Sequence, residues 1–208
     1  MIIAKAVILI LFIIVCEGRL CGGVIQLATR DFEWISSICE KDGFEVEKVK
    51  KSTEYLFENY YKAKRARELD RPVITDGEEL RLQQQKIRHE FLHIITEGGS
   101  KEEYNKLIWD ALSTSWIDER IQMLLEEMTE YSDVGSLYRN ILEETYLKKK
   151  QLTNEELYAA CGLGKTAYYE RKKEAVVLFG VLLWKFAHGR ELEDIAKGII
   201  EPTDKLSA

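Results

Sequence analysis

The chain has 208 residues, and its 30 lysines and arginines against 36 aspartates and glutamates give a formal net charge of −6. Hydrophobic residues make up 46% of it, which excludes a chain too polar to bury a core and allows one or two small domains. Prolines stand only at positions 72 and 202, and no alternating run of β-branched residues follows position 30. We therefore expect an all-α fold.

Residues 1–23 form an apolar leader. One lysine near the start is followed by eleven apolar residues, a length typical of the hydrophobic region of a signal peptide and too short for a membrane span of about 20 residues. A second interpretation is that the leader is not translated natively. Gly22 and Gly23 can be encoded by a purine-rich sequence that resembles a ribosome-binding site, ahead of a start at Val24 or Leu27. Both interpretations stay open.

The four cysteines form no CxxC pair and have no metal-ligand spacing. Without the leader only Cys39 and Cys161 remain, and two such thiols are typical of buried apolar residues in a reduced protein. We therefore predict a cytoplasmic protein without a cofactor, and without a membrane partner if the leader is absent.

Residues 24–131 are predicted to form a helical region for association. Between Val46 and Leu69, apolar side chains recur with the 3.6-residue period of a helix. The pair Arg71-Pro72 then breaks that helix.

Two further helices are predicted in the same region. One runs from Glu78 to Thr96 and ends at two glycines. The next begins at Ser100, which has Glu103 at the spacing of a capping box, and its apolar stripe continues to Tyr131.

A later stretch predicts two helices joined by a tight turn. Thr153 and Glu156 have capping-box spacing, so a helix is expected from about Asn154. Gly162 ends that helix, because glycine tolerates a positive φ. A second helix is expected from about Lys165.

The second helix is expected to bury one face and expose the other. Tyr168, Ala175 and Val176 would face inward, and the aliphatic part of Arg171 would be partly covered. An upstream helix would complete the core with residues at helical spacing: Leu137, Ile141, Leu142, Thr145 and Tyr146. A tight turn followed by a helix with an exposed basic N-terminal half fits the major groove of DNA. We therefore predict a C-terminal three-helix helix-turn-helix domain.

The predicted DNA-binding domain covers residues 136–190, after a boundary at 132–135 and before a tail at 191–208. It holds ten Lys/Arg against six Asp/Glu, a net charge of +4, which leaves −10 for the remainder of the chain. The positive charge is therefore concentrated where a phosphate backbone would lie.

Two family resemblances lie in this part of the chain. The run ILEETYLKKKQLTNEELYAACGLGKTAYYERKKEAV resembles the fourth region of bacterial sigma factors, which reads the −35 promoter element. The phrase AYYERKKEAVVLF resembles the recognition helix of the ArpU family of phage and prophage transcriptional regulators, and VEKVKKSTEYLFENYYKAKRARELD is similar to that family's N-terminal helix. The chain departs from these patterns at Gly164, where Ser or Thr is usual, and at Arg171, where sigma factors more often have an apolar residue.

The ArpU resemblance implies control of late, packaging or lysis genes in a phage or prophage of a Gram-positive host. We accordingly predict a sequence-specific DNA-binding regulator that is not an enzyme. Its partners would be double-stranded promoter DNA and, through the N-terminal helices, RNA polymerase or a second copy of the chain. Palindromic half-sites in the DNA would imply a homodimer.

Eight side chains are predicted to contact DNA. Phosphates would be held by Thr153, Lys172 and Lys173. The side chains that would reach base edges are Lys165, Thr166, Tyr169 and Glu170. Arg171 can face either way.

Two alternatives remain. A sigma-like factor would need RNA polymerase before it binds DNA tightly. A secreted zinc metallopeptidase is suggested by His89, Glu90 and His93, an HExxH spacing that puts two imidazoles on one helical face and a glutamate beside the metal-bound water. No third ligand is identifiable from the sequence, and a helix with two polar histidines on its outer face explains the same residues.

Overall fold

The computed structural model describes residues 24–69, 77–97, 100–113, 115–131, 133–148 and 152–199. Within these ranges the regular structure is helical and no strand occurs, so the predicted all-α fold class is confirmed. The apolar leader lies outside the described residues.

The elements are, in chain order, α2 (Val24–Lys41), α3 (Val46–Leu69), α4 (Gly77–Glu97), α5 (Lys101–Ser113), α6 (Ser115–Met128), α7 (Gly135–Leu142), the π-helical turn η1 (Glu143–Leu147), α8 (Asn154–Cys161) and α9 (Lys165–Ala196). The helices predicted over 46–69 and 78–96 appear as α3 and α4. The Ser100 capping box is present, since the backbone N–H of Ser100 donates to Glu103 Oε2 at 2.7 Å and that of Glu103 donates to Ser100 Oγ at 3.2 Å. The single helix predicted from Ser100 to Tyr131 is instead two helices, α5 and α6.

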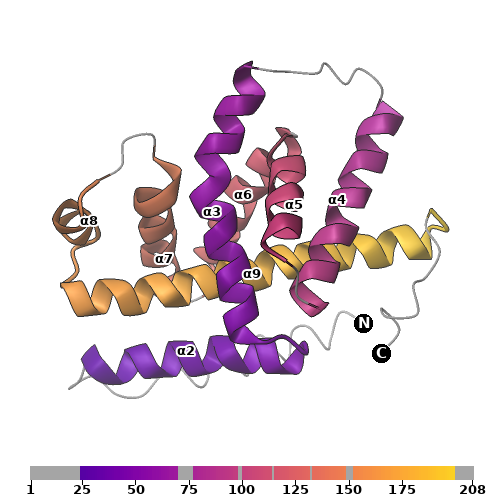
Figure 1. The fold of residues 1–208 in the computed structure, drawn as a ribbon. Coiled ribbons are helices and arrows are strands. Elements are labelled where there is room, and N and C mark those ends of the chain that lie inside the picture. Colours follow the sequence, from indigo (N-terminus) through magenta and orange to yellow (C-terminus); the bar gives the residue numbers. More distant parts are fainter. Residues whose placement is uncertain are drawn as a thin grey trace.

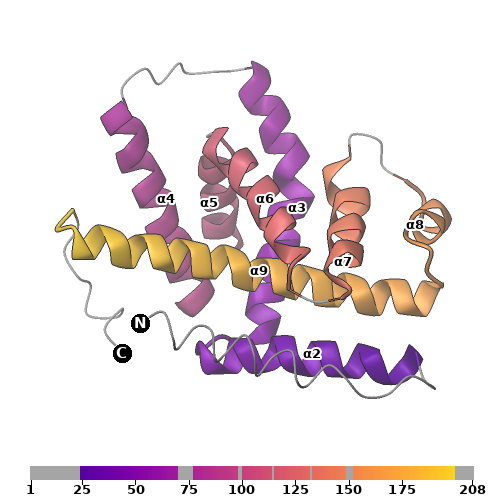
Figure 2. The ribbon, with the colours of Figure 1, turned by 180° about the vertical axis from the view of Figure 1, so that it is seen from behind.

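Helix α9 is the axis of the fold. It contacts α2, α3, α4, α6, α7 and α8. Figure 1 shows α2 alongside it on one side, α7 and α8 on the opposite side and α3 running across it, and Figure 2 shows the same arrangement from behind. The run from Glu174 to Trp184 is buried at every position. A helix that is apolar on all sides is stable only when it is enclosed, so this run requires the ring of helices around it.

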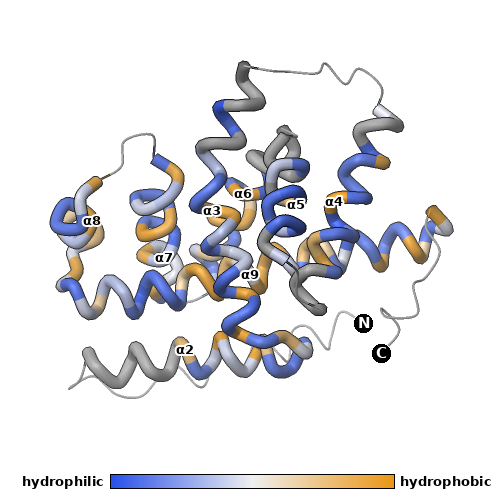
Figure 3. The backbone as a smooth tube through the Cα atoms, viewed as in Figure 1, coloured by the Kyte–Doolittle hydropathy of each residue, from blue (hydrophilic) through white to orange (hydrophobic). Residues whose placement is uncertain are grey.

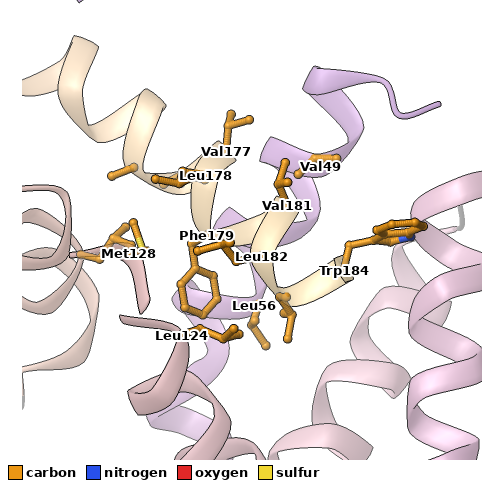
Figure 4. Close-up of a cluster of buried hydrophobic side chains, with 14 of the residues drawn as sticks. Val49, Leu56, Leu124, Met128, Val177, Leu178, Phe179, Val181, Leu182 and Trp184 are labelled. Atoms are coloured by element: carbon orange, nitrogen blue, oxygen red, sulfur yellow. The ribbon is translucent and has the colours of Figure 1, made fainter. Parts of the chain in front are cut away.

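The main core forms where the middle of α9 meets α3 and α6. Figure 4 shows Phe179 and Leu182 of α9 among Leu56 of α3 and Leu124 of α6. The Phe179 ring lies 4.8 Å from that of Phe57 between centroids. Along α9, Figure 3 shows hydrophilic residues at the N-terminal end and hydrophobic ones where it passes α3.

Helix α3 crosses α9 at a glycine. A Cβ atom on Gly180 would lie 2.2 Å from Thr53 Oγ1 and 2.6 Å from Val49 Cγ1. Only a residue without a side chain therefore fits between the two helices at this crossing.

One continuous core joins the two regions that the sequence divides at 132–135. It extends from Ile35 and Cys39 of α2 to Tyr138 and Leu142 of α7, through α9. The predicted division falls at the turn between α6 and α7, and the two-domain description stays a prediction. Helix α9 continues into the stretch predicted as a tail, where Asp194 forms an ion pair with Arg88 of α4 and both are buried.

Candidate nucleic-acid interface

Helix α8 and the turn after it have the predicted local structure. The backbone N–H of Thr153 donates to Glu156 Oε2 at 2.8 Å, and the N–H of Glu156 donates to Thr153 Oγ1 at 3.3 Å. Gly162 has a φ of 65°. The N–H of Leu163 then donates to the carbonyl of Tyr158 at 2.9 Å, which closes the turn. Both the capping box and the glycine turn are confirmed.

Helix α9 starts at Lys165, as predicted, with Gly164 at its N-cap and no side-chain hydrogen bond there. The missing Ser or Thr at 164 therefore leaves this helix start without the usual side-chain cap.

The start of α9 rests on α7, η1 and α8. Tyr168 is 1% exposed and lies in a small core with Ile141, Leu157 and Cys161. Its hydroxyl is 2.7 Å from Thr145 Oγ1. Figures 1 and 2 both show α8 end-on beside the N-terminal end of α9, so that the two helices cross. The inward face that the sequence predicts, including Ala175 and Val176 further along, is confirmed.

The first two turns of α9 present the side chains predicted to reach base edges. Lys165, Thr166, Tyr169 and Glu170 are all exposed, and Tyr169 retains 45% of its surface. In helix-turn-helix proteins the N-terminal residues of the second helix contact bases. The accessible end of α9 is therefore the end that such recognition uses.

Arg171 does not join that surface. It is 9% exposed, and its Nη1 donates to Glu174 Oε2 at 2.9 Å and to the Tyr138 hydroxyl at 3.3 Å. The Tyr138 hydroxyl donates in turn to Glu174 Oε2 at 2.8 Å. The sequence left two orientations open for Arg171, and the structure has the inward one. Arg171 therefore joins α9 to α7 inside the fold and is not part of the candidate interface.

Lys172 is half-buried against η1. Its Nζ lies 4.8 Å from the centroid of the Tyr146 ring. Burial lowers the pKa of the Lys172 ammonium, and the nearby carboxylates of Glu54 and Glu58 oppose that shift. A phosphate contact by Lys172 would therefore require it to leave the ring.

Lys173 faces the N-terminal helices. Its Nζ lies 3.5 Å from Glu47 Oε1 and 4.4 Å from the centroid of the Phe32 ring. The sequence gave no indication of these partners, because they come from α2 and α3.

Thr153, the third predicted phosphate contact, is exposed, but its hydroxyl already serves the capping box and donates to Glu156 Oε2 at 3.1 Å. Of the four basic residues predicted to contact DNA, Lys165 is thus the exposed one.

One residue of this surface was not predicted. Tyr158 of α8 lies against Tyr169, with the two hydroxyl oxygens 3.2 Å apart. The only sequence signal was an aromatic residue on a very short helix directly before the glycine turn, which does not by itself indicate a partner.

The HExxH residues lie on α4, far from this surface along α9. His89 and His93 are exposed and line a pocket of about 250 Å³ with Glu90, Glu103 and Lys106. His89 Nδ1 lies 3.3 Å from Glu191 Oε1 of α9. Among the residues that the structure describes, no group of three or more His, Cys, Asp or Glu side chains is arranged to hold a metal ion. The metallopeptidase alternative stays a prediction without an assembled ligand set.

Both described cysteines are buried free thiols, as predicted for Cys39 and Cys161. Burial raises the pKa of the Cys39 thiol to about 11. In the described part of the chain, no helix combines the length and the apolar character that crossing a membrane requires.

Comparisons of this chain with models of protein families, with curated proteins and with solved structures find no match.

Proposed function

We propose that the chain is a sequence-specific DNA-binding transcriptional regulator that reads promoter DNA with the N-terminal end of α9. The observation that carries the proposal is the exposed set at that end: Lys165, Thr166, Tyr169 and Glu170. A capped α8 and a left-handed glycine turn hold the helix end in place. In helix-turn-helix proteins the second helix lies in the major groove while the first crosses the DNA backbone. The tight turn and the crossing of α8 and α9 would allow α9 to enter the groove in this way.

The exposed side chains have the chemistry for reading bases. A lysine ammonium donates to guanine O6 and N7, or to a phosphate. A threonine offers both a hydroxyl and a methyl group, and the methyl group can contact the thymine methyl. A glutamate accepts from the amino group of cytosine. We therefore expect Lys165 to supply charge and Thr166 and Glu170 to supply sequence preference.

The biological role follows from resemblance alone. The likeness of AYYERKKEAVVLF to the ArpU family supports control of late, packaging or lysis genes in a phage or prophage. The helices before α7 would then contact RNA polymerase or a second copy of the chain. A sigma-like factor is the variant of this proposal in which DNA binding requires polymerase.

The proposal is tested by selecting binding sites for the purified full chain from a random duplex library. Affinity for the selected duplex is then measured over a range of salt concentrations, beside unrelated DNA. Lys165→Ala should weaken binding to all sequences and reduce the salt slope by about one, whereas Thr166→Ala should change the preferred sequence. Lys51→Ala, which removes an exposed lysine from α3, is the matched control and should change neither.

Three other outcomes are informative. Selective binding only in the presence of RNA polymerase would support the sigma-like variant. Absence of selective binding under both conditions would overturn the proposal. Stoichiometric zinc with peptide hydrolysis that is lost in Glu90→Gln would support the metallopeptidase instead.

A further inference from the structure

Tyr158, Tyr168 and Tyr169 form an aromatic cluster at the junction of α8 and α9. The Tyr158 ring lies 5.1 Å from that of Tyr168 and 6.1 Å from that of Tyr169, between centroids. The Tyr168 and Tyr169 rings are 5.5 Å apart with an interplanar angle of 78°. Such tilted contacts are the preferred arrangement of aromatic pairs. The cluster therefore connects the two helices of the turn.

Tyr169 is the most exposed member of this cluster, and Tyr158 is partly exposed. Tyr168 is buried, and its hydroxyl pairs with that of Thr145. Tyr169 is 45% exposed, yet its ring lies beside those of both Tyr168 and Tyr158, whose centroids are 5.5 Å and 6.1 Å away. A side chain already held by two neighbours loses less rotational freedom when it binds a partner.

The hydroxyl groups form a directed pair. Tyr158 donates its hydroxyl hydrogen to the Tyr169 oxygen at 3.2 Å. Tyr169 then keeps its own hydrogen for an acceptor outside the protein, and accepting one hydrogen bond strengthens a hydroxyl as a donor. The same hydrogen bond is the main reason that the pKa of the Tyr158 phenol is raised to about 12.

We infer that Tyr158 is a positioning residue for DNA recognition. It holds Tyr169 so that the Tyr169 O–H is donated to an acceptor oxygen or nitrogen of the duplex, and Tyr158 itself does not touch the DNA. The inference rests on the proposed function, because it assigns a role within the same surface.

A double-mutant cycle on the full chain tests the inference, with the selected duplex as the probe. Tyr169→Phe removes the outward hydroxyl and should weaken binding by about three- to tenfold, the usual effect of one hydrogen bond. Tyr158→Phe keeps both rings but removes the donor, and should weaken binding by about threefold. Tyr158→Phe combined with Tyr169→Phe should bind no worse than Tyr169→Phe alone, since Tyr158 acts only through Tyr169.

Two controls separate this role from a general loss of structure. Tyr104→Phe removes a hydroxyl from α5, where it accepts from Ser52 at 3.0 Å, and should leave DNA affinity unchanged. The ionisation of Tyr158, followed by NMR of its labelled ring without DNA, should shift to lower pH in Tyr169→Phe. That shift would verify the hydroxyl pair independently of any binding.

The pattern of affinities also identifies the acceptor. Loss that is equal on all duplexes assigns a phosphate, and loss that depends on one base position assigns a base edge. If Tyr158→Phe binds as the parent does, or if the two losses multiply in the double variant, the positioning role is overturned while DNA binding stands. If the parent chain does not bind DNA, the proposed function and this role fail together.

Discussion

The two halves of α9 belong to one continuous helix, but one half is partly exposed and the other is fully enclosed. From Lys165 to Lys173 one side of the helix rests on α7 and α8 and the other is open, whereas every residue from Glu174 to Trp184 is buried. The buried half needs neighbours on all sides, and α2, α3, α4 and α6 supply them. The enclosed half thereby fixes the course of the helix, and the open half continues it with one face exposed.

Within the open half, side-chain contacts and not charge decide which basic residues are exposed. Lys165 is exposed and Arg171 is buried, although both are basic and lie on the same half of the helix. Lys172 and Lys173 are intermediate, because Tyr146 covers one and Phe32 and Glu47 contact the other. A count of basic residues therefore overstates the charge that this surface offers to DNA.

The largest effect should come from the centre of the buried half. Phe179→Ala should lower the free energy of unfolding by about 3–5 kcal/mol, because Phe179 is fully buried beside Phe57 and its removal leaves a cavity. Glu170→Ala, in the open half, should change it by no more than about 0.5 kcal/mol. Urea denaturation followed by circular dichroism measures both. Equal losses in the two variants would remove the distinction between the halves.

Arg171 should behave as a residue of the buried half. Arg171→Met removes the guanidinium that contacts the buried Glu174 carboxylate at 2.9 Å and should cost about 3 kcal/mol of unfolding free energy. The combined variant Arg171→Met, Glu174→Leu should recover much of that loss, since both charges of the buried pair are then removed together. If Arg171→Met instead keeps the stability of the parent chain but binds DNA more weakly, Arg171 contacts the DNA.

Two glycines of α9 should respond in opposite directions. Gly180→Ala places a Cβ atom against Thr53 and Val49 of α3 and should lower the free energy of unfolding by about 1–3 kcal/mol. Gly189→Ala meets no atom within 4 Å and should raise it by about 0.5–1 kcal/mol, because alanine is the better helix former. Thermal unfolding of the two variants compares them directly. A stable Gly180→Ala variant would mean that α3 does not cross α9 so closely.

Sequence reasoning succeeded where the structure is decided by near neighbours. Thr153 with Glu156, and Ser100 with Glu103, are pairs three residues apart whose hydrogen bonds need no other part of the chain. The left-handed turn at Gly162 is equally local. These features fix the start of α5, both ends of α8 and the start of α9.

Sequence reasoning failed where distant segments decide. The apolar stripe continues past the end of α5, so nothing in its period signals the break before α6. The burial of Arg171 depends on Tyr138 of α7, and the cover over Lys173 depends on Phe32 and Glu47. Helical spacing identifies a face of a helix, but it does not say which distant segment lies against that face.

The smallest effect is expected for Glu47→Gln, which tests whether Lys173 is available to DNA or stays covered by α2 and α3. Its ion pair with Glu47 is largely exposed, with relative side-chain exposures of 39% and 72%, so Glu47→Gln should change the unfolding free energy by less than about 1 kcal/mol. If Lys173 can turn from Phe32 towards a phosphate, losing the competing carboxylate should strengthen DNA binding and steepen its salt slope by up to about one. Glu45→Gln makes the same change of charge beside Lys48, whose Nζ lies 3.0 Å from Glu45 Oε1. It should affect DNA binding less, because Lys48 belongs to α3 and not to the DNA-binding end of α9. If the two variants change DNA affinity equally, only the net charge of the chain matters, and Lys173 stays in contact with Phe32 when DNA binds.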